Sequence, residues 1–127
     1  MKYLSLQRSV VLLRISVALV FFLHAAVRVV HNTVPEFTQF MAGKHWPFPN
    51  VTVWVLSGYE LIGSVLLALG YCVKWLSAGF ILILVVGIIL IHLSLGWFVG
   101  EHGTGGVEYS FILIVALVVV MAGDRER

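Results

Sequence analysis

The chain has 127 residues, of which 61% are hydrophobic and 11% charged, and its formal net charge is +2. Its mean hydropathy of +1.05 lies far outside the range of soluble globular domains and indicates an integral membrane protein. The few basic residues are better explained by membrane topology than by a nucleic-acid-binding surface, so no nucleic-acid partner is expected.

Four apolar stretches match the length of a membrane-spanning helix, which takes about 20 residues. They are continuous and do not alternate in polarity, so they predict helices rather than the strands of an outer-membrane barrel. We therefore expect an all-α fold, in which residues 1–127 form a single four-helix transmembrane bundle. The expected helices are residues 10–30, 51–71, 75–95 and 107–122.

The first stretch could also be the apolar part of a signal peptide, because Lys2 and Arg8 precede it and the small-residue sequence HAAV lies near its end. Arg14 interrupts the apolar region, which favours a helix that is retained in the membrane. After this helix, residues 35–41 predict a short amphipathic segment. Trp46 and its aromatic neighbours then predict an anchor in the headgroup layer.

Cys72 is the single cysteine of the chain, and it cannot form an internal disulfide. Enzymes that cycle disulfides need a pair of cysteines, so any redox role of this chain requires a partner or a bound cofactor. The segment GEHGTGGVEY before the fourth helix is rich in glycine but lacks the spacing of a nucleotide-binding loop. It is interpreted as a connection.

Basic residues gather on one side of the expected membrane: they precede the first helix, lie in the turn that contains Lys74, and close the chain. The loops on the other side contain only Lys44. The positive-inside rule therefore places both termini and the Lys74 turn in the cytoplasm. The expected location is the inner (cytoplasmic) membrane of a bacterium, with the longer loops on the periplasmic side.

With this topology, the ionisable and polar residues within the spans converge on the outer half of the membrane. Glu60 lies roughly 13 Å below the outer start of its helix, at 1.5 Å of rise per residue. Intramembrane ionisable residues usually face the interior of a bundle and pair there. The expected pocket residues are His24, Arg28, Glu60, His92, Glu108 and Tyr109.

Glu60 needs a partner, because an unpaired charge in the membrane costs at least ~2.5 kcal/mol. The order of preference is Arg28, then His24, then the deeper Arg14. On the first helix these three residues and His31 fall within an arc of about 100°, so the whole stripe is expected to face protein. The alternative to a functional pocket is an ion pair that only fixes how the helices pack.

Other members of this cluster also have simpler explanations. His92 lies near the rim of the third helix, where it could meet water. Glu108 in the first turn of the fourth helix would interact favourably with the helix dipole. Arg14 could extend towards the inner headgroups. His31, His45 and His102 are interpreted as solvated loop residues.

Several sequence motifs together resemble the DoxX family of small four-helix membrane proteins. They are LLRISVALVFFLHAAVRVVH, FTQFMAGKHWPFPN, YELIGSVLLALGYCVKW, a histidine late in the third helix, and GGVEYSFILIVALVVVMAGD. The resemblance covers nearly the whole chain. Two positions differ from the common pattern, with Ala25 and Ser64 where many members have glycine.

The resemblance implies similarity to the membrane subunit of thiosulfate:quinone oxidoreductase and to a subunit of an oxidative-stress complex, in a functionally mixed family. Three hypotheses follow. The chain is a quinone-linked subunit of a redox complex, in which His24, His92 or Arg28 bonds the quinone oxygens and Glu60 relays protons. Alternatively it is a binding or transport module for a small polar ligand, or a structural assembly subunit.

Whether the chain is itself an enzyme stays open, and quinone is the candidate cofactor. No metal site is expected, and haem is disfavoured, because a lone histidine on each of two helices is a weak signal and no HExxH or Glu-x-x-His spacing occurs. The expected partners are the lipid bilayer and either other protein subunits or further copies of the chain.

Overall fold

The computed structural model describes the backbone of residues 5–92 and 107–124, and the side chains of residues 5–90 and 107–123. The described residues form helices and contain no strand, which confirms the expected all-helical class. The elements are α1 (Leu6–Val30), α2 (Val34–Gly43), α3 (Pro49–Leu69), α4 (Val73–Gly87), the π-helix η1 (Ile88–His92) and α5 (Glu108–Asp124).

Three of the helices are long and apolar enough to cross a membrane: α1, α3, and α4 with the start of η1. The chain is therefore a membrane protein. The fourth expected span, α5, has 17 residues and rises about 25 Å. This is somewhat less than the ~30 Å hydrocarbon core of a typical bilayer.

The helix ends follow local backbone chemistry. The Ser5 hydroxyl accepts a hydrogen bond from the Arg8 backbone N–H and caps α1, so this helix begins four residues before the expected residue 10. Asn32 after α1 and Cys72 before α4 have positive φ. Gly70 ends α3 with φ 90°, a conformation that glycine adopts most readily. The expected boundaries of α3 and α5 differ from the observed ones by one or two residues.

The third expected span, residues 75–95, differs most from the structure. The α-helical part ends at Gly87, and Ile88–His92 form a π-helix, in which hydrogen bonds join residues five apart. The described part of the chain stops at His92, so the expected end at residue 95 lies outside it.

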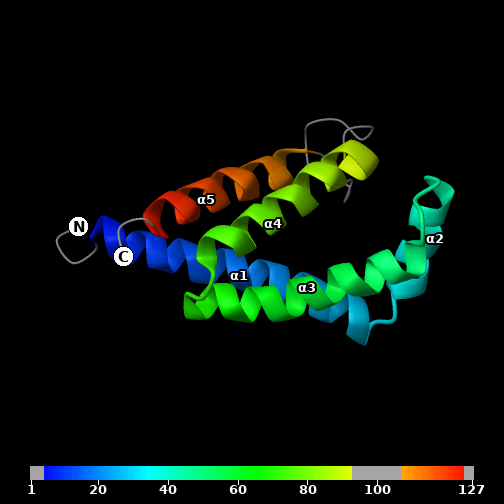
Figure 1. Cartoon of the computed structure of the whole chain (residues 1–127), viewed down its shortest axis with the longest axis horizontal. Coiled ribbons are helices and arrows are strands. Elements are labelled where there is room, and N and C mark those ends of the chain that lie inside the picture. The colour runs from blue at the N-terminus through cyan, green and yellow to red at the C-terminus, as the bar shows by residue number, and fades with distance from the viewer. Residues whose placement is uncertain (1–4, 93–106, 125–127) are drawn as a thin grey trace.

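The helices are arranged in two pairs. Figure 1 shows α1 beside α3 and α4 beside α5. The start of α1, the end of α5 and the α3–α4 turn lie at one end of the molecule, which we name the turn end. Helix α2 lies across the other end, the α2 end. Towards the α2 end, the two pairs diverge (Figure 1).

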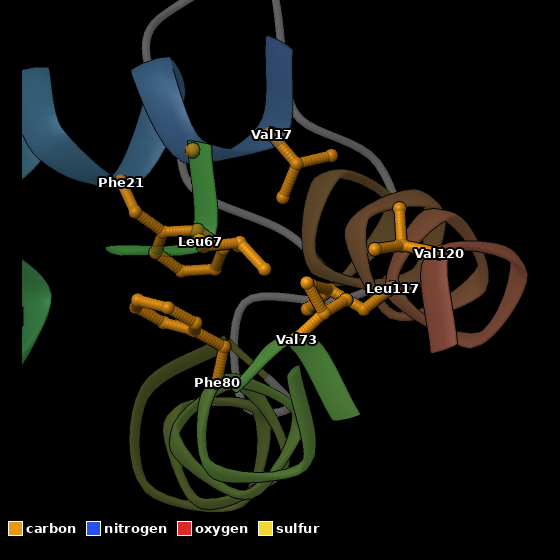
Figure 2. Close-up of a cluster of buried hydrophobic side chains, with 8 residues drawn as sticks. Val17, Phe21, Leu67, Val73, Phe80, Leu117 and Val120 are labelled. Carbon is orange, nitrogen blue, oxygen red and sulfur yellow. The ribbon is translucent and has the colours of Figure 1, made fainter. Parts of the chain in front are cut away.

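The main hydrophobic core lies towards the turn end. Figure 2 shows its side chains meeting between α1, α3, α4 and α5. The rings of Phe21 and Phe80 stack with centroids 4.2 Å apart, which adds a specific contact to the buried apolar area. The labelled core residues are Val17, Phe21, Leu67, Val73, Phe80, Leu117 and Val120. A smaller cluster of Val34, Met41 and Val53 joins α2 to α3.

Candidate functional site

The centre of the site is a buried ion pair between α1 and α3. Arg28 Nη1 lies 3.2 Å from Glu60 Oε2, and both side chains are almost fully buried. Arg28 is the partner that the sequence analysis prefers for Glu60, and the structure confirms this pair. Arg28 lies in the α2-end half of α1 and Glu60 near the middle of α3, and these two helices pack side by side (Figure 1).

Two further contacts hold the Arg28 guanidinium. Its Nη1 donates a hydrogen bond of 3.0 Å to Ser57 Oγ, one helical turn before Glu60 on α3. The ring of Phe37 on α2 lies 4.9 Å from the Arg28 Cζ in a cation–π contact. Glu60 Oε2 makes no hydrogen bond of good geometry, so it meets Arg28 at ion-pair distance only. This oxygen is therefore held by charge and keeps hydrogen-bonding capacity.

This pair lies in the wall of a cavity of about 850 Å³. The cavity is bounded by the α2-end halves of α1, α3, α4 and α5, together with α2 itself. Most of its wall is apolar, with a few polar groups, as in the pockets that bind small organic ligands. The polar and aromatic lining residues are Phe21, His24, Arg28, Thr33, Glu36, Phe37, Phe40, Trp46, Thr52, Glu60, Tyr109 and Ser110.

The cavity includes four of the six pocket residues that the sequence suggested: His24, Arg28, Glu60 and Tyr109. Tyr109 is half-exposed at the start of α5. Glu108, the first residue of α5, is partly buried and is not among the lining residues. His92 ends η1, and its side chain lies outside the described residues.

The expectation that the whole polar stripe of α1 faces protein is wrong for two residues. Arg14 and Arg28 are buried, whereas His24 and His31 are exposed. The buried residues of α1 centre on the direction of Phe21, so the two histidines lie at the edge of that face. His24 still reaches the cavity rim, and His31 caps the end of α1.

Arg14 lies nearer the turn end of the bundle than the Arg28–Glu60 pair does. Its Nη2 donates a hydrogen bond of 3.3 Å to the Ala68 carbonyl oxygen, eight residues and about 12 Å along α3 from Glu60. Arg14 is therefore packed against α3 near the turn end. Its hydrogen bond joins the first half of α1 to the last turn of α3.

The contribution of α2 and the following loop to the cavity was not predicted. Trp46, expected as an anchor in the headgroup layer, is half-buried and lines the cavity. Its Nε1–H donates a hydrogen bond of 3.0 Å to Thr52 Oγ1 on α3. The amphipathic periodicity of residues 35–41 was the available signal that α2 covers other helices.

Residues 9–93 match the family model of DoxX, which is more than half of the chain. The chain belongs to the DoxX family. Comparison with curated proteins and with solved structures found no match. In this DoxX chain the matched region runs from the first turn of α1 to the end of η1, and it therefore includes the Arg28–Glu60 pair and α2.

Proposed function

We propose that this chain is the quinone-binding membrane subunit of an oxidoreductase complex. The observation that carries the proposal is the large, mainly apolar cavity with the Arg28–Glu60 pair in its wall. A quinone ring is a flat apolar body with two carbonyl oxygens. It therefore needs apolar walls and a small number of well-placed hydrogen-bond donors.

The two charged residues have complementary roles in this proposal. Arg28 uses one N–H for Ser57, and a guanidinium has five, so others remain to donate to a ring oxygen. Reduction of a quinone to a hydroquinone takes up two electrons and two protons. The Glu60 carboxylate, whose Oε2 lacks a well-aligned hydrogen bond, would pass these protons to or from the ring. The electrons would be exchanged with a partner subunit.

We also propose that the chain crosses the bacterial inner membrane four times, with both termini in the cytoplasm. Helix α5 packs along α4 and α1 (Figure 1), and a helix slightly shorter than the hydrocarbon core is accommodated by local thinning of the bilayer. In this topology the cavity faces the extracytoplasmic half of the membrane. Its redox partner would then lie on the extracytoplasmic side.

The alternatives are less well supported by the geometry. A pair that only fixes helix packing needs no cavity, whereas Arg28 and Glu60 both line one. A small anionic ligand would need an unneutralised cation, but the Arg28 charge is already balanced by Glu60 at 3.2 Å. A quinone needs hydrogen bonds and apolar contact and no net charge, so it fits this cavity better.

Tryptophan fluorescence tests the proposal, because quinones quench the emission of a nearby indole. The purified chain in lipid nanodiscs is titrated with a ubiquinone that carries one isoprenoid unit. Trp46 lines the cavity, whereas Trp54 and Trp75 are 51% and 79% exposed, so quinone dissolved in the lipid would quench them by collision without saturation. We expect saturable quenching, most of which is lost in Trp46→Phe.

The substitution Arg28→Lys replaces the planar guanidinium with a single ammonium group on a shorter side chain. It should weaken quinone binding about tenfold, because one charge-assisted hydrogen bond is lost. The matched control is Arg8→Lys on the exposed first turn of the same helix, which should leave binding unchanged. Quenching that does not saturate, or equal affinity in both variants, contradicts the proposal.

A further inference from the structure

Helices α3 and α4 are closely packed only from the turn end to the level of Tyr59. The Tyr59 hydroxyl donates a hydrogen bond of 2.9 Å to the Leu76 carbonyl oxygen, and its ring lies 5.0 Å from that of Phe80. A Cβ placed on Gly63 would lie 3.4 Å from both Leu76 and Phe80. These contacts leave no space between the two helices at this level.

Beyond Tyr59 the same two helix faces line the cavity. On α4, Ile83 and Val86 follow Gly79 at intervals of four and three residues, so they continue the face that contacts α3. Leu90 follows them on η1 and also lines the cavity. On α3, Leu56 and Thr52 precede Tyr59 by three and seven residues on its face. All five residues line the cavity. We name these two facing rows the α3–α4 seam.

The seam also reaches the outer surface of the bundle. Leu82 lines the cavity and is 64% exposed. It lies nine residues from the start of α4, or about 14 Å along the helix. This is near the middle of a hydrocarbon core ~30 Å thick. In the proposed topology the exposed side of Leu82 therefore meets lipid chains rather than water. Figure 1 shows α3 and α4 diverging towards the α2 end.

We propose that the cavity receives its ligand sideways from the bilayer through the α3–α4 seam, and that the ligand is a quinone with an isoprenoid tail. This inference rests on the proposed quinone-binding function and specifies its substrate class. The ring lies at Arg28 and Glu60, and the tail lies along the apolar row of Ile83, Val86 and Leu90 and leaves towards the lipid. The cavity of about 850 Å³ is large enough for a drug-sized molecule, more than a single ring.

The test compares two probes with the same ring in nanodiscs: tailless ubiquinone-0 and ubiquinone-2, which has two isoprenoid units. Both affinities are expressed as mole fractions in the lipid, so that partitioning into the bilayer is removed from the comparison. We expect ubiquinone-2 to bind about tenfold more tightly. Leu56→Phe and Val86→Phe, which enlarge side chains in the seam, should reduce the ratio of the two affinities to about twofold.

A thermal unfolding midpoint close to that of the unsubstituted chain shows that these variants are folded. The matched control is Leu69→Phe at the turn end of α3, where the side chain is 64% exposed; it should keep the full tenfold preference. Equal affinities of the two probes in the unsubstituted chain would overturn this inference alone. If neither probe quenches, the proposed function fails and this inference fails with it.

Discussion

Arg28 and Glu60 show how a membrane-embedded carboxylate selects its partner. Depth along the helices was enough to predict this pair, because an ionisable group in lipid requires a counter-charge at its own level. The contacts of Arg28 with Ser57 and Phe37 were not predictable in the same way. They depend on the rotation of α3 and on the position of α2, and neither is specified by depth.

At the residue scale, a double-mutant cycle tests whether the two charges depend on each other. Arg28→Met leaves the Glu60 carboxylate buried without its cation and should lower the free energy of unfolding by roughly 3 kcal/mol. In Arg28→Met/Glu60→Gln the charge is removed as well, and most of the loss should be recovered. Thermal unfolding in detergent measures both. A double variant as unstable as the single one would show that the pair is not coupled.

At the scale of elements, the contact between α3 and α4 depends on one glycine. A Cβ on Gly79 would collide with the Tyr59 hydroxyl oxygen, which is held in place by its hydrogen bond to Leu76. The helix pair can therefore approach at this level only without a side chain at residue 79. Periodicity predicted both helices but not this contact, since nothing in one helix specifies which residue of the other will face it.

Gly79→Ala should consequently destabilise the protein by about 1–3 kcal/mol, the usual cost of overpacking. Gly58→Ala is the matched control on α3, because a Cβ there has nothing within 4 Å and alanine favours the helix. Adding Tyr59→Phe to Gly79→Ala removes the colliding oxygen and should restore part of the loss. Thermal unfolding distinguishes these outcomes, and equal effects of the two glycine substitutions would contradict the proposed packing.

At the scale of the whole molecule, hydropathy predicted the helical membrane class and the approximate spans, because the bilayer itself imposes their length. The π-helix Ile88–His92 shows the limit of this reasoning. A π-turn advances each residue through a smaller angle than an α-turn, so faces assigned at 100° per residue no longer hold there. The direction of His92 was therefore beyond a prediction from α-helical periodicity.

The proposed topology has a direct test in the single cysteine. Cys72 is exposed at the α3–α4 turn, which the positive-inside rule places in the cytoplasm. A membrane-impermeant maleimide should therefore fail to label intact bacterial spheroplasts and should label them after permeabilisation. In a Cys72→Ala background, Lys44→Cys after α2 should be labelled without permeabilisation. The reverse pattern would invert the topology.

The stack of Phe21 on Phe80 forms the floor of the cavity, since Phe21 lines it and both rings belong to the packed core (Figure 2). Below this floor, Leu67 and Leu117 have no exposed surface. Within the described part of the chain the cavity is therefore closed at this end, and it offers ions no continuous aqueous path. With the proposed topology and ligand, the cavity would exchange a quinone with one leaflet while the packed core below it keeps the electrical insulation of the membrane intact.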